Sequence, residues 1–136
     1  MVQPLDHDRL RRIAAFGEVF DARDFTFGEW EPSRQTANGA WTMPYYVFSS
    51  AAREFLATLV VDPSVDWPAW ASTEEAQHLR EPAAIAAATP EQLVKLMTWI
   101  VRSDRFSEGS IAGAYESGVL RAIIARAAQL TEGEGG

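Results

Sequence analysis

The chain has 136 residues, of which 47% are apolar, and it carries 12 basic against 19 acidic residues, no cysteine and a formal net charge of −7. This length fits a single domain with a core large enough to fold without covalent cross-links. The lack of cysteine excludes disulfides, thiolate metal sites and a cysteine nucleophile, and the acidic balance argues against direct binding to a nucleic-acid backbone. No apolar run approaches the ~20 residues of a membrane-spanning helix, and the N-terminal residues do not resemble a secretory signal. We therefore expect a cytoplasmic protein with no membrane partner.

The N-terminal third predicts one helix followed by a hairpin. Apolar residues recur at helical spacing from Leu10 to Phe20, and Asp6 is placed to cap that helix. Farther along, polar and aromatic residues alternate, and Asn38-Gly39 is a strong turn dipeptide. These features predict strands near 25–31 and 40–43. Because Pro44 lacks an N–H group, we expect the second strand to end there or to lie at an edge.

The middle of the chain contains start signals for three helices. Ser49 or Ser50 can cap a helix that ends before Asp62-Pro63. Ser72 and Glu75 have the spacing of a capping box, which predicts a short helix through about Leu79. The segment Thr89-Pro90-Glu91-Gln92 combines a hydroxyl cap, a proline at the first helical position and a glutamine at the reciprocal capping position. It predicts a helix from 90 to about 103.

Two glycines and a final apolar stripe organise the C-terminal part. Gly109 and Gly118 bracket a short helical segment, and an amphipathic helix follows from Val119. Residues 1–131 are thus predicted to form one helical domain, with a disordered tail at 132–136. The expected fold is an α-rich α+β domain, a compact bundle of four to six helices with a short β-hairpin near residues 25–43.

The densest polar cluster runs from Arg102 to Gly109. In one interpretation it is a structural corner between two helices, in which its arginines pair with nearby acids such as Asp104 or Glu108. In the other, Arg102 and Arg105 clamp a carboxylate or a phosphate through paired hydrogen bonds. The interleaved acids weaken this second interpretation because they repel an anion.

A second cluster lies between residues 62 and 81, where acids are concentrated. Trp67 and Trp70, which follow Asp66, would share one face of a helical turn and could stack on a ligand or partner. The alternative is that these rings pack in the core beside Trp30, Trp41 and Trp99. Glu74 and Glu75 extend the acidic surface, which could bind a basic partner.

Signatures of catalysis and of metal or cofactor binding are missing from the sequence. His7 and His78 are the only histidines, and neither has a second histidine nearby in sequence. Phosphate-binding loops, dinucleotide-binding turns and nucleophile elbows are also lacking. We assign no catalytic residue, no metal ligand and no cofactor.

The combined motifs resemble a family of small uncharacterised bacterial proteins. The resemblance lies in Arg102-Ser103-Asp104-Arg105-Phe106-Ser107-Glu108-Gly109, in the upstream Asp66-Trp67-Pro68-Ala69-Trp70, and in Met43-Pro44-Tyr45. It covers about residues 25 to 130 and implies a domain of unknown function, so it transfers no catalytic role. It also implies that the two clusters occur together and could meet in space.

Two functions remain open from the sequence. The first is a non-enzymatic interaction module that binds a protein partner through an acidic and aromatic surface, for which the residues are Asp66, Trp67, Trp70, Glu74 and Glu75. The second is a protein or enzyme that binds a small anionic ligand in a pocket built from Arg102, Arg105, Glu108, Trp67 and Trp70. Self-association through an exposed hairpin edge is a further alternative.

Overall fold

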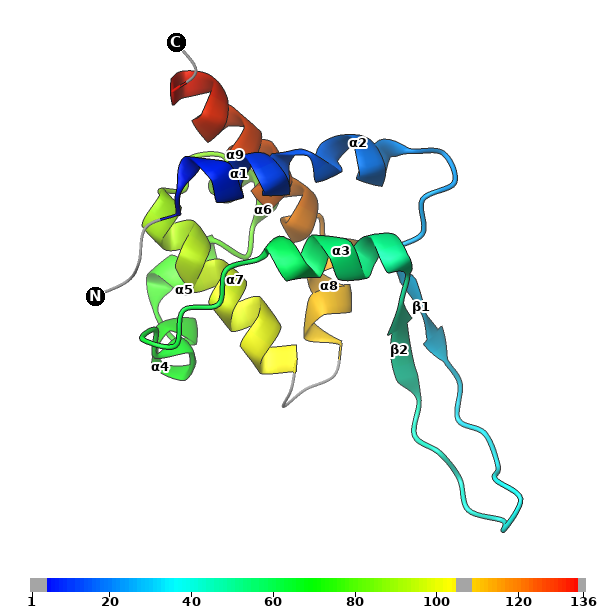
Figure 1. Ribbon diagram of the computed structural model, residues 1–136. Coiled ribbons are helices and arrows are strands. Elements are labelled where there is room, and N and C mark those ends of the chain that lie inside the picture. Colours follow the sequence, from blue (N-terminus) through cyan, green and yellow to red (C-terminus); the bar gives the residue numbers. More distant parts are fainter. Residues whose placement is uncertain (1–4, 105–108, 135–136) are drawn as a thin grey trace.

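The computed structural model describes residues 5–104 and 109–134 and shows a helix-rich α+β fold (Figure 1). Arg105 and Glu108, two of the predicted site residues, lie outside the described residues. Along the chain the elements are α1 (His7–Ala14), α2 (Phe16–Asp21), β1 (Gly28–Glu31), β2 (Tyr45–Phe48), α3 (Ser50–Thr58), α4 (Trp67–Ala71), α5 (Glu74–His78), α6 (Pro82–Ile85), α7 (Pro90–Asp104), α8 (Ser110–Glu116) and α9 (Val119–Glu134).

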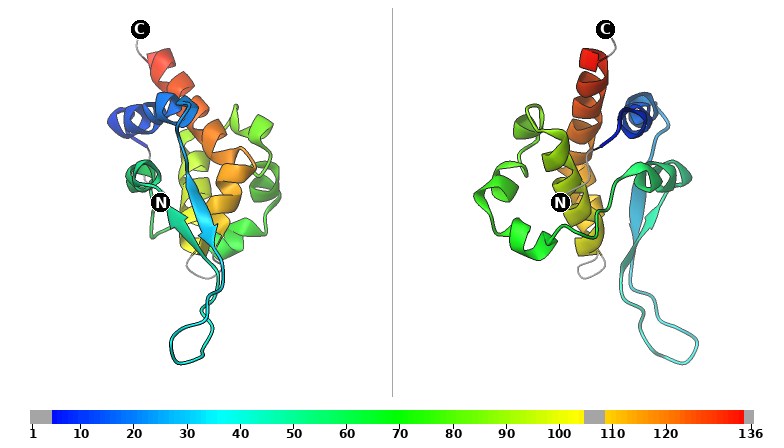
Figure 2. Two further views of the ribbon diagram at one scale, coloured as in Figure 1. Left: turned by 90° about the vertical axis from the view of Figure 1, so that its right-hand side faces the viewer. Right: turned by 60° about the vertical axis from the view of Figure 1, so that its left-hand side comes forward.

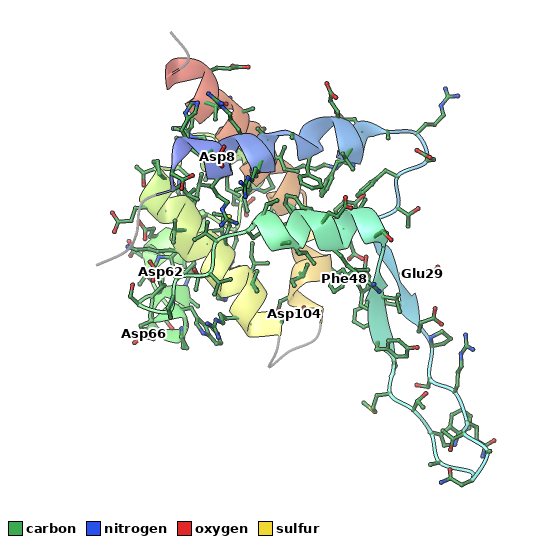
Figure 3. All side chains as sticks on the ribbon, in the orientation of Figure 1. Asp8, Glu29, Phe48, Asp62, Asp66 and Asp104 are labelled. Carbon is green, nitrogen blue, oxygen red and sulfur yellow. The ribbon has the colours of Figure 1, made fainter. Side chains whose placement is uncertain are left out.

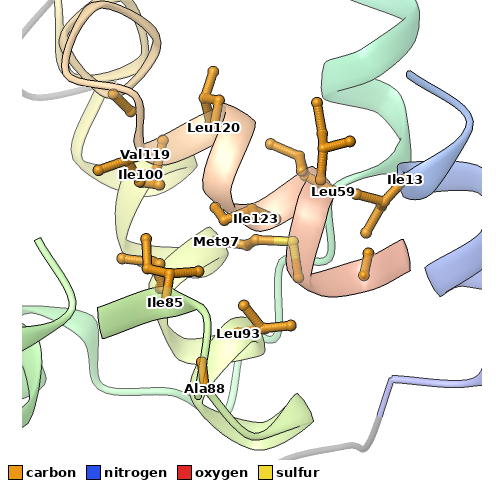
Figure 4. Packing of buried hydrophobic residues seen from close by; sticks show 14 of the residues in the cluster. Ile13, Leu59, Ile85, Ala88, Leu93, Met97, Ile100, Val119, Leu120 and Ile123 are labelled. Atoms are coloured by element: carbon orange, nitrogen blue, oxygen red, sulfur yellow. The ribbon is translucent and has the colours of Figure 1, made fainter. Parts of the chain in front are cut away.

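The core lies between the two longest helices, α7 and α9. Met97 of α7 and Ile123 of α9 are fully buried and meet in its centre (Figure 4). Helices α1 and α6 pack against α9, and they add Ile13 and Ile85 to the same cluster. The apolar stripes that predicted helices at both ends of the chain are therefore the faces that meet here.

Most of the predicted helix starts are confirmed. Asp6 accepts a hydrogen bond from the backbone N–H of Arg9, and Ser49 accepts one from Ala52. At the start of α7 the capping box is complete. The N–H of Gln92 donates to Thr89 Oγ1 (3.1 Å), and the N–H of Thr89 donates to Gln92 Oε1 (2.9 Å).

Three details differ from the sequence prediction. Ala15 separates the predicted first helix into α1 and α2. The predicted capping box at Ser72 is wrong, because Thr73 is the N-cap of α5 and accepts from the N–H of Ala76. Glu75 does not close this box, because its carboxylate accepts hydrogen bonds from the side chains of Trp70 and Gln92 instead. At the C-terminus, α9 continues to Glu134.

The predicted second strand at 40–43 is also misplaced, because β2 begins after Pro44. Strands β1 and β2 pair antiparallel, from Gly28 opposite Phe48 to Glu31 opposite Tyr45. An isolated bridge between Gln35 and Trp41 keeps the same register, which places Pro32 opposite Pro44. Neither proline has an N–H group to donate, so the ladder stops at this pair.

Beyond the proline pair the hairpin continues to a tight turn. The N–H of Thr42 donates to the carbonyl of Arg34 (2.8 Å), and that of Thr36 donates to the carbonyl of Ala40 (2.7 Å). Three residues close the loop, and the last of them, Gly39, has a φ of +87°. This is the left-handed conformation that such a three-residue loop requires, and it confirms the turn predicted at Asn38-Gly39. We call residues 28–48 the arm.

The arm is fixed at its base and projects away from the helices (Figures 1 and 2). Phe27, which precedes β1, is buried and stacks on Tyr115 of α8, with 4.3 Å between ring centroids. Farther along β1, the Trp30 ring lies against Gly109 at the start of α8. A Cβ atom added to Gly109 would be 3.3 Å from that ring. The outer part of the arm therefore extends from a well-packed aromatic base.

Candidate functional site

The two tryptophans of α4 occupy different environments. Trp70 is only 7% exposed, and its indole N–H donates to Glu75 Oε2 (2.7 Å). Its ring faces Trp99, with 6.5 Å between centroids. Trp67 is half-buried and lines a cavity that Trp70 does not reach. Trp70 thus belongs to the core, as the structural interpretation of the sequence expected, whereas Trp67 faces a cavity.

Glu75 is held inside a small polar network and is not part of a free acidic surface. Gln92 Nε2 donates to its Oε1 (2.9 Å), and Lys95 Nζ lies 3.9 Å from its Oε2. The hydrogen bond from Gln92, followed by that from Trp70, holds the pKa of Glu75 below its ordinary value, and Lys95 adds to this effect while burial opposes it. Glu74 remains exposed. Trp70 and Glu75 are therefore not part of an open binding surface around α4 and α5, because Trp70 is buried and Glu75 is hydrogen-bonded within the protein.

A cavity of about 300 Å³ brings the two sequence clusters together. Arg102, near the end of α7, lines it with Trp67 and Asp66, which lie more than thirty residues earlier. Trp70 does not line it. Asp66 also caps α4 by accepting from the N–H of Ala69 (3.2 Å). Of the two tryptophans of α4, Trp67 is thus the one that lines a cavity together with Arg102.

Asp62 also lines this cavity, and both its carboxylate and its backbone N–H form hydrogen bonds within the protein. Its Oδ1 accepts from the N–H and from the hydroxyl of Ser64, at 2.9 and 2.7 Å, and its own N–H donates to Thr98 Oγ1 (3.1 Å). Figure 3 shows Asp62 and Asp66 on one side of the molecule, beside α4. Two aspartates thus line the cavity with Arg102, and their charges oppose the binding of a simple anion.

Asp104 has a structural role at the junction of α7 and α8 (Figure 3). Its Oδ1 accepts from the backbone N–H of Gly109 (3.2 Å) and of Ile111 (3.1 Å). These N–H groups belong to the first turn of α8, where no preceding carbonyl is available to them. Asp104 therefore caps α8 from the C-terminal end of α7, a role that the sequence interpretation did not assign to it.

The arm carries a surface that the sequence interpretation missed. Among the described residues, the exposed large apolar side chains are Trp30 (47%), Trp41 (68%), Met43 (80%) and Tyr45 (49%), and all four lie on the arm. Trp30 and Trp41 do not pack in the core, in contrast to the alternative considered for them. Because side chains alternate along an extended chain, Trp41, Met43 and Tyr45 share one face. We call these three residues the exposed stripe.

The exposed stripe is flanked by acidic residues. In the observed register Glu31 is opposite Tyr45, and Glu29 is opposite Val47, on the same face of the ribbon. The period-two spacing of Trp41, Met43 and Tyr45 is visible in the sequence and was the available signal. Pro44 obscures this spacing, because a proline predicts the end of a strand, whereas here it lies between two extended segments with the same register.

Neither a metal centre nor a membrane span is found in the part of the chain that the structure describes. No group of three or more histidine, aspartate or glutamate side chains is arranged to hold a metal ion within residues 5–104 and 109–134. Over the same ranges, every helix is too short or too polar to cross a bilayer.

Comparison with known proteins identifies the family. Residues 5–133 match the model of a family of unknown function, DUF6508, which covers nearly the whole chain and both sequence clusters. The comparisons with curated proteins and with solved structures return no match. The expected resemblance to a family of unknown function is therefore confirmed. The chain belongs to the family DUF6508.

Proposed function

We propose that this protein is a cytoplasmic, non-enzymatic interaction module that binds a protein partner through the exposed stripe of its arm. The observation that carries this proposal is the concentration of exposed large apolar side chains on one projecting hairpin. Contiguous exposed apolar surface is uncommon on monomeric proteins and is typical of interaction sites. Tryptophan and tyrosine are also enriched among the residues that dominate binding energies.

The chemistry of the arm restricts the kind of partner. Trp41 and Tyr45 offer large rigid side chains that lose little conformational entropy on binding for the area they bury, and Met43 adds a flexible apolar side chain that adapts to the partner surface. Glu29 is exposed on the same face, near the base of the arm, whereas Glu31 on that face is already paired with Arg34 at 3.0 Å. A partner surface that is apolar at its centre and basic at one edge would complement this arrangement.

The arm supports partner binding better than the surface first predicted around α4 and α5. Trp70 is buried, and Glu75 already accepts hydrogen bonds within the protein. Binding through those groups would first have to break these internal contacts. The side chains of the exposed stripe are available without any such rearrangement.

The test of this proposal is the substitution Trp41→Ser. Because Trp41 is 68% exposed, we expect the fold to remain intact while partner binding weakens roughly tenfold or more. Affinity capture from the source cells would first identify proteins retained by the wild type and lost with the variant. The binding of each purified candidate would then be measured directly by calorimetry.

Gln35→Ser is the matched control, because Gln35 pairs with Trp41 in the same bridge and adds no large apolar side chain. Its binding should equal that of the wild type. Equal affinities of the wild type and Trp41→Ser for every purified partner would contradict the proposal.

A second candidate function is the binding of a small ligand in the cavity formed by Arg102 and Trp67. The guanidinium group would hold a carboxylate and the indole would stack on a ring, while Asp62 and Asp66 limit the affinity for a plain anion. Benzoate and inorganic phosphate are suitable probes in an NMR titration. We expect benzoate to shift the Trp67 indole signal in the wild type and not in Arg102→Gln. Identical titrations of the two proteins would eliminate this candidate.

A further inference from the structure

The cavity lined by Arg102 and Trp67 combines side chains of opposite charge with apolar ones. Its charged side chains are those of Arg102, Asp62 and Asp66. Its apolar side chains are those of Trp67, Val65, Pro63 and Pro68. The volume of about 300 Å³ is at the lower end of the range for small-molecule sites. A ligand that complements this cavity is therefore small and has both charged and apolar groups.

The guanidinium group of Arg102 is half-buried, and it has no hydrogen-bond or ion-pair partner among residues 5–104 and 109–134. The two other half-buried arginines in this part of the chain are Arg9 and Arg126, and both donate to backbone carbonyl groups. A buried donor without a protein partner costs free energy unless water or a ligand accepts its hydrogen bonds. A carboxylate matches the paired donors of a guanidinium group.

Asp66 supplies a negative charge to the same cavity. Its Oδ1 accepts from the N–H of Ala69 (3.2 Å), whereas its Oδ2 has no partner among the residues that the structure describes. Asp66 and Arg102 line one cavity but form no ion pair with each other there. A ligand between them can therefore give an ammonium group to Asp66 and a carboxylate to Arg102.

Contacts between the loop before α4 and helix α7 hold the cavity in shape. The N–H of Asp62 donates to Thr98 Oγ1 (3.1 Å), and Thr98 is only 1% exposed. Thr98 and Arg102 are four residues apart on α7, so they share one face of this helix. Because the structure already fixes the loop opposite Arg102, little ordering is required when a ligand binds.

We infer that the ligand of this cavity is a zwitterionic amino acid with an apolar or aromatic side chain. Its carboxylate binds Arg102, its ammonium group binds Asp66, and its side chain packs on the indole of Trp67. A plain anion is repelled by the aspartates and a plain cation by Arg102, whereas a zwitterion satisfies both charges. This inference rests on the second candidate function, the binding of a small ligand in this cavity, and names the ligand class.

The test compares three ligands that share one carbon skeleton. Phenylalanine carries both charges, 3-phenylpropionate lacks the ammonium group, and 2-phenylethylamine lacks the carboxylate. Each is titrated into the protein while the indole N–H signal of Trp67 is followed by NMR, with Trp67→Phe used to assign that signal. We expect phenylalanine to bind roughly fivefold or more tightly than either of the other two, because only phenylalanine forms both charge-assisted contacts.

Two variants remove the charges of the cavity one at a time. Asp66→Asn keeps a side-chain oxygen that can cap α4 and removes the negative charge, so the preference for phenylalanine over 3-phenylpropionate should disappear. Arg102→Gln should likewise abolish the preference for phenylalanine over 2-phenylethylamine. Structural damage would weaken the binding of all three ligands together, so the loss of one particular preference reports on charge recognition.

Glu74→Gln and Arg53→Gln are the matched controls. Each removes one charge of the same sign from an exposed position that does not line the cavity. Both variants should keep the two preferences of the wild type, and thermal melting checks the fold of all four variants. If the controls lose the preferences as strongly as Asp66→Asn and Arg102→Gln do, the preferences come from net charge and the inference is wrong.

The outcomes separate this inference from the function on which it rests. If benzoate and 3-phenylpropionate bind through Arg102 as tightly as phenylalanine does, the second candidate function stands and the amino-acid inference is wrong. A preference for phenylalanine that survives in Asp66→Asn also overturns the inference. If no ligand shifts the Trp67 signal, both are wrong. Partner binding through the exposed stripe is tested separately and does not depend on these results.

Discussion

Replacing Phe27 with alanine is expected to lower the free energy of unfolding by about 3–5 kcal/mol, a large share of the total stability of a small domain. Phe27 is 2% exposed and is surrounded by rings. It stacks on Tyr115, and it makes edge contacts with Phe20 and Phe48, with centroids 5.9 and 5.8 Å away. The cavity left by Phe27→Ala would therefore remove contacts from both sides of the junction between the arm and the helices.

Chemical denaturation followed by circular dichroism measures this loss. The control is Trp41→Ala on the same hairpin, which should change the free energy of unfolding by no more than about 0.5 kcal/mol because this side chain is exposed. A loss below about 1 kcal/mol for Phe27→Ala would show that the base of the arm is not part of the cooperative core. Comparable losses for the two variants would contradict the distinction between a packed base and a free outer stripe.

Trp70→Ala should have an effect of similar size, about 3–5 kcal/mol, because it removes a buried indole from the contact with α7. Trp70→Phe keeps most of the ring volume and removes the N–H group that donates to Glu75 at 2.7 Å. For this variant we expect a smaller loss, of about 1 kcal/mol. Denaturation of both variants separates packing from hydrogen bonding, and equal losses would mean that packing contributes little at this position.

The same network predicts how stability depends on pH. Because the pKa of Glu75 is lower in the folded protein than its ordinary value of 4.5, its carboxylate stabilises the fold fully above that value. This contribution is lost as the pH falls below 4.5 and through the lower folded pKa, since the protonated carboxyl no longer accepts both hydrogen bonds as an anion. Stability measured by denaturation at a series of pH values should therefore decline less steeply in Trp70→Phe. Glu75→Gln, which removes the titrating group, should lack this part of the decline altogether, and an unchanged slope would contradict the assignment.

Features controlled by neighbouring residues could be predicted well. The start of α7 depends on Thr89, Pro90 and Gln92, which lie within four positions of one another, and the observed capping box has the predicted partners. The turn at Asn38-Gly39 depends on a single glycine with a positive φ. The prediction at α5 was wrong by one residue. Ser72 has helical backbone angles as the C-cap of α4, whereas Thr73 has the extended backbone that an N-cap needs.

The candidate site could be predicted only in part. Of the five residues expected to form one pocket, Arg102 and Trp67 line one cavity and Trp70 does not, while Arg105 and Glu108 lie outside the described residues. Their spacing along the chain gave no means of distinguishing Trp67 from Trp70, because both lie on one helical turn and the difference depends on which side Trp99 and Glu75 approach. The sequence interpretation missed the exposed stripe because aromatic residues are often buried, and only the position of the arm shows that these side chains are exposed among the described residues.

The sequence by itself determined the helix-rich α+β class, the caps of several helices, the apolar faces that form the core and the membership of a family of unknown function. Each of these depends on interactions between residues close in the chain, or on a periodic pattern that any packing must satisfy. The tertiary structure decided the strand at Tyr45–Phe48, the burial of Trp70, the meeting of Arg102 with Trp67 and the exposure of the stripe. These four features depend on contacts between segments that are distant in the sequence. The free energy of such contacts depends on which surfaces meet in three dimensions, so short-range sequence patterns do not predict them.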